Sequence, residues 1–309
     1  MNYDVIIIGG GPAGLSAALT LGRAKRLVLV ISEDLPRNRV TYETHGFLTN
    51  DSISPKEFYE KAYKDLKKYP NIVRLQNKAI DIIKDNNTFF VTTNEKKVYE
   101  SKKVIIASGV KDKLPEYQSF KEYYGKSIFP CPFCDGWEHK DHQLALFLED
   151  EHSYHYVKMI SQWNNDLIVF TNGKKVLSEI EINILFENGI KVVNEKIKAL
   201  HGNNGLLESI ELENKKVYQR NAAFIKTSVE MNLEFADKLN LEKEKNIIKT
   251  TVEGKTSCFG VYLAGDVKLS GSYQIATAVA QGLSVAIAIH AEMVNESYKK
   301  SEEKYAYNF

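Results

Sequence analysis

Two cysteines separated by two residues, Cys131 and Cys134, are the side chains of this sequence best suited to chemistry. Thiols at this spacing can close a small disulfide or open to a dithiol, and that change moves two electrons. A metal site is the main alternative, but it needs more ligands, and the sequence has no second pair of this kind. Cys258 lies in an apolar stretch and is predicted to be a buried bystander. The pair therefore predicts redox function.

A glycine-rich turn near the N-terminus, G-G-G-P-A-G over residues 9–14, predicts a dinucleotide site. Gly9 allows a tight turn, Gly11 lets the backbone approach a pyrophosphate, and Gly14 permits close packing of a helix on a strand. The N-terminus of that helix offers N–H donors to the anion. An acidic residue for the ribose is expected about twenty residues later. Glu33 is the nearest candidate, although a surface acid is an equally good interpretation.

The turn has the context that its motif needs, because apolar runs predict a strand before it, a helix after it and a second strand next. The same order returns after the cysteines, so the sequence predicts two βαβ units with parallel strands. The expected strands are 5–8, 27–31, 73–75, 88–93, 104–107, 144–148, 167–170 and 261–264, and the expected helices are 13–21, 55–68, 153–163 and 273–294. Together, the dinucleotide turn and the cysteine pair indicate flavin-linked dithiol/disulfide exchange.

The length, net charge and apolar segments of the chain limit the classes of protein that it could be. Its 309 residues are enough for two domains. A formal net charge of +1 without a basic stripe gives a nucleic-acid partner no electrostatic support. No secretory or membrane-spanning segment is expected, because the apolar run 279–289 is too short to span a bilayer. We therefore expect a cytoplasmic protein, in which a closely spaced cysteine pair is more often catalytic than a structural staple.

Four motifs together resemble one known family. They are the turn at residues 9–14, Ala107-Ser108-Gly109, the run from Cys131 to Gly136, and Ala264-Gly265-Asp266. Their order and spacing are similar to those of the low-molecular-weight thioredoxin reductases, over nearly the whole chain. Residues 36–38, 45–47 and 137–138 look more like a branch of thioredoxin-reductase-like proteins that includes oxidases closing dithiols in small natural products.

The resemblance implies an α/β fold with two Rossmann-like domains of the FAD/NAD(P)-binding type, the second inserted in the first. The FAD-binding domain would comprise residues 1–113 and 224–309, and the inserted NAD(P)H-type domain, with the cysteine pair, residues 114–223. It also implies a homodimer and a rotation between the domains. No metal is expected.

The resemblance also implies cofactor contacts. Asp266 would hydrogen-bond the ribityl chain of FAD, and Gln274 and Ala276 would lie beside the flavin ring, where the helix dipole favours negative charge on reduced flavin. His45 would approach the isoalloxazine, although a lone histidine is more often structural. With the first turn and its acid, the expected cofactor-binding residues are Gly9, Gly11, Pro12, Ala13, Gly14, Glu33, His45, Gly109, Gly265, Asp266, Gln274 and Ala276.

The family pattern assigns three catalytic roles around the cysteine pair. Cys134 would face the flavin, and Cys131 would attack the substrate disulfide. Asp135 would exchange the proton that a leaving thiolate needs near neutral pH.

The sequence departs from the family at the second dinucleotide turn, which should lie at residues 148–153. That stretch has no glycine and contains Glu149, Asp150 and Glu151. Carboxylates repel a pyrophosphate, and side chains block the close approach that glycine permits. Lys174 and Lys175 follow the next strand and could meet a phosphate, but surface lysines are the simpler interpretation. Binding of NAD(P)H is therefore doubtful.

The sequence thus predicts a flavoenzyme that passes electrons through the cysteine pair to a protein disulfide, with thioredoxin as the expected partner. The donor would be a carrier other than NADPH, such as reduced ferredoxin, as in similar-looking family members that lack the NADPH motifs. Three alternatives remain at this point: an NADPH-dependent thioredoxin reductase, an oxidase that closes small dithiols with O2, and a non-enzymatic flavin redox sensor.

Overall fold

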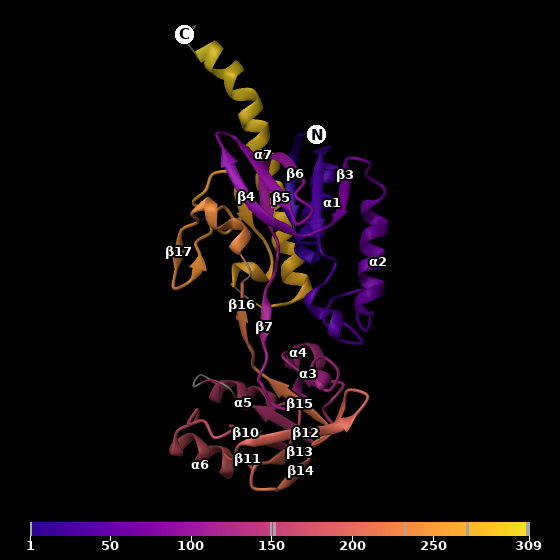
Figure 1. Cartoon of the computed structure of the whole chain (residues 1–309), viewed down its shortest axis with the longest axis vertical. Helices are drawn as coiled ribbons and strands as arrows, with labels where there is room; N and C mark the ends of the chain where they lie inside the picture. Colours follow the sequence, from indigo (N-terminus) through magenta and orange to yellow (C-terminus); the bar gives the residue numbers. More distant parts are fainter. Residues whose placement is uncertain (1, 149, 151–152, 232, 270–271, 307–309) are drawn as a thin grey trace. The chain divides into compact units, whose positions relative to one another are not determined.

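A computed structural model describes residues 2–148, 150, 153–231, 233–269 and 272–306 (Figure 1). The chain forms two compact units. The first unit comprises Met1–Arg37, Lys56–Lys111 and Met231–Phe309, and the second comprises Asn38–Pro55 and Asp112–Glu230. The expected division differs from these units mainly at residues 38–55, which group with the second unit. As a division into cofactor-binding domains, it stays a prediction.

The first unit is built on a sheet in the order β3-β2-β1-β6-β5-β4, with β19 also paired to β6. The neighbours β3-β2-β1-β6 and the β6–β19 pair are parallel, whereas β4, β5 and β6 pair antiparallel. The elements of this unit are β1 (Asn2–Ile8), α1 (Pro12–Arg23), β2 (Val28–Ser32), α2 (Pro55–Leu66), β3 (Ile72–Gln76), β4 (Ala79–Asp85), β5 (Thr88–Thr93), β6 (Val98–Ile106), η2 (Glu234–Leu239), β17 (Lys243–Glu244), β18 (Ile247–Ile248), β19 (Val261–Leu263), η3 (Asp266–Lys268) and α7 (Ile275–Ala306).

Side chains of β1 alternate between two hydrophobic layers. Ile6 and Ile8 pack in a core with η2 and the antiparallel strands, whereas Val5 and Ile7 pack in a core with α1 and α7. A strand buried on both faces needs an unbroken apolar run, which is why the four residues before the glycine turn are all Val or Ile. The expected first βαβ unit is confirmed.

Helix α7 is longer than expected: it runs from Ile275 to Ala306, whereas the sequence predicted 273–294. Among the described residues, the stretch Ile275–Lys299 is the one helical segment that is long and apolar enough, by length and composition, to cross a membrane. Only 28% of its most apolar part is buried inside the protein. The expectation considered only the run 279–289, and the apolar part of the helix is longer than that run. Its buried residues Ala286, Ile289 and Met293 belong to the core with α1, and the expected absence of a membrane partner stays a prediction.

The second unit is built on a parallel sheet in the order β11-β10-β9-β15-β8, beside an antiparallel sheet β12-β13-β14 (Figure 1). The expected second βαβ unit is confirmed as β9, α5 and β10. The elements are η1 (Arg37–Val40), which begins in the first unit, β7 (Lys111–Lys113), α3 (Phe120–Tyr123), β8 (Ile128–Phe129), α4 (Pro132–Asp135), β9 (Leu144–Phe147), α5 (Tyr154–Ile160), β10 (Leu167–Phe170), α6 (Glu179–Glu187), β11 (Lys191–Val193), β12 (Ile197–Asn203), β13 (Leu206–Leu212), β14 (Val217–Gln219), β15 (Ala222–Ile225) and β16 (Ser228–Glu230), which pairs with β7.

A buried lysine joins β6 to α7 in the first unit. The Lys103 side chain is 2% exposed, and its Nζ lies 2.6 Å from both Glu292 Oε1 and Glu296 Oε1. We expect Lys103→Met to lower the free energy of unfolding by about 2 kcal/mol, because Glu292 and Glu296 lose the buried ammonium that they share, although Lys255 still pairs with Glu292 at 3.0 Å and Glu296 is partly exposed. Urea unfolding measures this loss. Lys102→Met is the matched control, because Lys102 is exposed and its bond to Asp4 should contribute less than about 1 kcal/mol.

The stabilisation by Lys103 should depend on pH. Burial raises the pKa of Glu292, but hydrogen bonds from Lys103 and Lys255 outweigh it, so that the net pKa is lowered. A carboxyl with a lowered folded-state pKa stabilises the fold above its unfolded pKa and loses that contribution as the pH falls through the folded value. The difference between wild type and Lys103→Met should therefore shrink in acid. An equal difference at acid and neutral pH would contradict the assignment.

Candidate functional site

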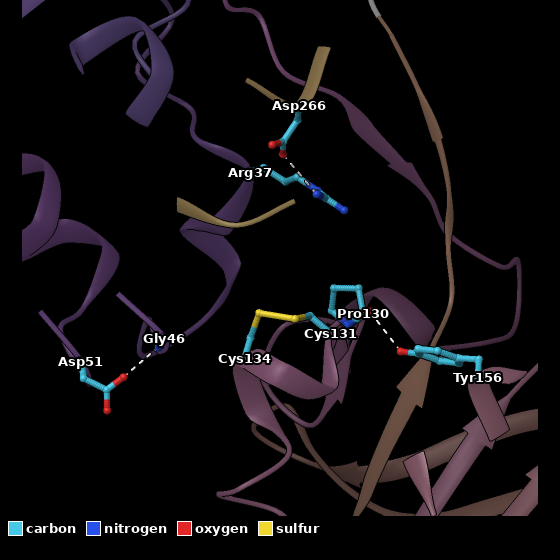
Figure 2. The surroundings of a disulfide bond; sticks show 8 residues. All are labelled: Arg37, Gly46, Asp51, Pro130, Cys131, Cys134, Tyr156 and Asp266. Atoms are coloured by element: carbon cyan, nitrogen blue, oxygen red, sulfur yellow. Dashed lines mark hydrogen bonds and ion pairs between the residues drawn. A yellow bond between two sulfur atoms is a disulfide. The ribbon is translucent and has the colours of Figure 1, made fainter. Parts of the chain in front are cut away.

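The cysteine pair forms a disulfide at the start of the short helix α4 in the second unit (Figure 2). Cys131 is extended at the N-cap, and Pro132 occupies the first helical position, where its missing N–H costs nothing. The backbone N–H of Cys134 donates to the Cys131 carbonyl oxygen at 3.2 Å. On the other side, the Tyr156 hydroxyl of α5 donates to the Pro130 carbonyl oxygen at 3.1 Å. These bonds fix the backbone on both sides of the sulfurs.

Asp135 follows the second cysteine and closes helix α4. Although part of the residue reaches solvent, burial of its carboxyl raises the pKa of Asp135 to about 7, with the charge of Glu138 as the second cause. A carboxyl with this pKa can donate and accept a proton near neutral pH, as exchange through thiolates requires. The proton-transfer role of Asp135 stays a prediction that this environment suits.

His45 lies in a loop of the second unit, surrounded by three carboxylates. Its Nε2 lies 3.5 Å from Glu43 Oε2, and its Nδ1 lies 3.7 Å from Glu138 Oε1 and 3.9 Å from Asp51 Oδ1. Sequence reasoning gave His45 a flavin contact but missed Glu138 as its partner. The two lie far apart in sequence, and no periodic signal joins them. The flavin contact itself stays a prediction.

The first glycine turn forms a cradle at the end of β1. A Cβ added at Gly9 would lie 2.2 Å from the Ala107 carbonyl oxygen, and one at Gly14 would lie 2.0 Å from the Gly9 carbonyl oxygen, so both positions require glycine. In contrast, a Cβ at Gly11 or at Gly109 would meet nothing within 4 Å. The turn is therefore closely packed at Gly9 and Gly14 and open at Gly11, as the approach of a pyrophosphate to the N-terminus of α1 requires.

The other expected cofactor residues of the first unit also lie at turns and helix starts. Gly265 has a φ of +81° and precedes Asp266, whose Oδ2 accepts a hydrogen bond from Arg37 at 3.3 Å. The guanidinium of Arg37 also lies 5.0 Å from the centroid of the Tyr273 ring. Sequence reasoning did not single out Arg37 as a site residue. Its only signal was its place in the branch-specific residues 36–38.

Helix α7 begins one residue after Gln274, and the Gln274 carbonyl oxygen accepts the N–H of Ala278 at 3.0 Å. Ala276 is exposed in the first turn of the helix. Both residues therefore lie at the positive end of the helix dipole, where stabilisation of negative charge is strongest. Their contact with a flavin ring stays a prediction.

Two acidic residues, Glu33 and Asp34, follow β2, and they differ in their side-chain hydrogen bonds. Glu33 is exposed, whereas the carboxylate of Asp34 accepts hydrogen bonds from the Arg74 guanidinium at 3.1 Å and the Tyr63 hydroxyl at 3.3 Å. Glu33 is the more accessible of the two for a ribose. That assignment stays a prediction.

The second dinucleotide turn differs from the first in the part that the structure describes. Glu149 and Glu151 lie outside the described residues. Asp150 accepts a hydrogen bond from the Ser153 hydroxyl at 2.7 Å, immediately before α5. Asp150 thus brings a negative charge to the place where the family pattern expects a glycine and a phosphate.

A profile described as pyridine nucleotide-disulphide oxidoreductase matches residues 3–153 and 155–282. The chain belongs to this family. Within the family, it is similar to a probable thioredoxin reductase of Arthroderma benhamiae, with 33% identity over 96% of this chain and 81% of that protein. It is 24% identical to the thioredoxin reductase of Bacillus subtilis, over 96% of this chain and 97% of that one.

Among solved structures, a putative thioredoxin reductase TrxB from Bacillus anthracis has a TM-score of 0.91 and 35% identity, covering 96% of this chain and 99% of that one. This pyridine nucleotide-disulphide oxidoreductase is therefore a thioredoxin-reductase-like, flavin-dependent enzyme with the expected α/β fold of Rossmann-like sheets. The family binds FAD, and the open space at Gly11, at the N-terminus of α1, fits its pyrophosphate. In the described ranges, no group of three or more His, Cys, Asp or Glu side chains could hold a metal ion.

Proposed function

We propose that the enzyme passes electrons from bound FAD through Cys131 and Cys134 to the disulfide of a thioredoxin-like protein, and that its donor is not NADPH. The contrast between the two dinucleotide turns carries the proposal about the donor. The first turn leaves open space at Gly11, whereas the second has Asp150 bonded to Ser153 and no glycine. A carboxylate there repels a pyrophosphate and takes up the space it needs. Reduced ferredoxin is the proposed donor.

The chain's own residues would carry out the thiol steps. Bound FAD supplies a centre that takes up electrons singly or in pairs and exchanges a pair with a dithiol/disulfide couple. The thiolate of Cys131 attacks one substrate sulfur, forming a mixed disulfide and releasing the first substrate thiolate. Cys134 then attacks Cys131, closing the internal disulfide and releasing the second thiolate. The Asp135 carboxyl gives a proton to a leaving sulfur and recovers it from the Cys134 thiol.

One observation favours a second candidate, an NADPH-dependent reductase. A cavity of about 380 Å³ in the second unit is lined by Lys174, which follows β10, and by Lys196 and Lys198 near the start of β12. Three lysines beside one cavity attract anions such as a nucleotide phosphate, although Glu116 in the same lining opposes this attraction. Lys198 also pairs with Glu211 at 2.7 Å, which reduces the positive charge available there.

Anaerobic mixing of the FAD-loaded enzyme with each donor separates these functions. Reduced ferredoxin should bleach the visible flavin absorbance at the rate of turnover, and NADPH or NADH should not. Bleaching by NADPH at the turnover rate would overturn the proposed donor. In that case Lys174→Ala should weaken the NADPH response, whereas Lys175→Ala, outside the cavity lining, should not. Oxygen uptake with small dithiols, and no reduction of thioredoxin, would overturn the proposed direction of electron flow.

A further inference from the structure

The loop with His45 is built to hold its imidazole in one place. Thr44 and Ile53 form an antiparallel bridge, in which the Thr44 N–H donates to the Ile53 carbonyl oxygen at 2.8 Å. The Gly46 N–H donates to Asp51 Oδ1 at 2.8 Å (Figure 2), and Gly46 has a φ of +73° that favours glycine. The His45 side chain is only 12% exposed. The imidazole is therefore a fixed group rather than a mobile surface side chain.

This fixed imidazole meets the cysteine-bearing segment through Glu138. His45 Nδ1 lies 3.7 Å from Glu138 Oε1. Glu138 lies in the turn that follows α4, three residues after Asp135, the last residue of that helix. Burial and, second, the charge of Glu138 raise the pKa of Asp135. The charged groups facing His45 are Glu138 from this segment, and Glu43 and Asp51 from its own loop. His45, Glu138 and Asp135 thus form a connected series ending at the redox pair.

We propose that His45 is a positioning residue for the dithiol site, and that its charge, acting through Glu138, sets the protonation of Asp135. This inference rests on the proposed role of Asp135 and goes beyond it by naming the groups that tune it. When the imidazole is protonated, its positive charge offsets the negative charge of Glu138. The Asp135 carboxyl then experiences a smaller net repulsion from Glu138.

The two groups must act on Asp135 with opposite signs. His45→Gln removes the offset, so that Glu138 favours the neutral carboxyl and the Asp135 titration moves to higher pH. Glu138→Gln removes the repulsion, so that the titration moves to lower pH. We expect each shift to be about half a pH unit to one unit, which corresponds to a three- to tenfold change in the acid–base equilibrium. In a variant that already carries Glu138→Gln, His45→Gln should change the Asp135 titration little, because the Glu138 charge through which His45 is proposed to act is absent.

Carboxyl ¹³C NMR of the full-length oxidised, FAD-loaded enzyme measures these shifts directly. Aspartate is labelled at Cγ, and loss of one signal in Asp135→Asn assigns the resonance. His201→Gln is the matched control, because His201 also pairs with a glutamate of the second unit, at 2.8 Å from Glu211, and should leave the Asp135 titration unchanged. His45→Lys keeps a positive charge and should prevent the upward shift, which tests the charge even if the glutamine variant folds poorly.

Shifts of opposite sign in the two single variants would support the proposal. Unchanged titration in both, or shifts of the same sign, would overturn it. The NMR titration needs neither ferredoxin nor thioredoxin. A failed reductase assay would therefore leave it intact, and a failed titration would leave the proposed electron route intact.

Discussion

Replacing Cys131 by Ser is expected to lower the rate of disulfide exchange by at least about 1,000-fold while FAD stays bound. A serine hydroxyl is not ionised near neutral pH, and it cannot form the mixed disulfide that exchange requires. The expected FAD contacts other than His45 belong to the first unit, whereas Cys131 belongs to the second, so flavin content should not change. Turnover with thioredoxin and the ratio of visible to protein absorbance measure the two effects.

Cys258→Ser is the matched control for this experiment. Cys258 is a half-buried cysteine outside the disulfide and packs against the core beside η2. Its replacement should leave exchange within about twofold of wild type, because it has no part in the thiol steps. Retained exchange in Cys131→Ser, or loss of flavin from that variant, would contradict the assignment of the pair.

Gly11→Val is expected to weaken FAD binding by about 100-fold, or about 2.8 kcal/mol, without unfolding the protein. The φ of −74° and ψ of 179° at Gly11 are open to any residue, and an added Cβ meets no protein atom within 4 Å. The new side chain would instead fill the space that a pyrophosphate needs. Titration of the apoprotein with FAD, followed by flavin fluorescence, measures the affinity.

Gly14→Val separates this effect from a general loss of structure. A Cβ at Gly14 would lie 2.0 Å from the Gly9 carbonyl oxygen and 3.3 Å from the Ile7 side chain, so this variant should lose stability as well as FAD. Thermal melting of the two apoproteins should show a normal transition for Gly11→Val and a lowered one for Gly14→Val. Normal FAD affinity in Gly11→Val would place the cofactor elsewhere.

Both βαβ units could be predicted from the sequence because apolar runs report burial on both faces of a parallel strand. The run 144–147 is a strand with every residue buried, and it was predictable even though its turn has no glycine. The expected Rossmann-like fold and flavoenzyme class are confirmed. The cytoplasmic location and the homodimer stay predictions.

Other features could not be predicted because their signals are weak or nonlocal. The antiparallel strands β12 and β13 carry a mixture of buried and exposed residues with register shifts between them, which blurs the alternation that marks a strand. The contact of His45 with Glu138 joins residues far apart in the chain, and no local pattern encodes it. The role of Asp135 came from the family pattern, but its raised pKa depends on burial that only the folded structure shows.

The second unit is assembled from two separate pieces of the chain, so its boundaries fall at 37/38, 55/56, 111/112 and 230/231. A chimera that exchanges only the longer piece, Asp112–Glu230, would carry Glu138 into a new protein and leave His45 behind. A single crossover between relatives at 55/56 or at 111/112 would likewise take His45 and Glu138 from different parents. Successful grafts of the second unit, in the laboratory or in evolution, should therefore transfer Asn38–Pro55 together with Asp112–Glu230.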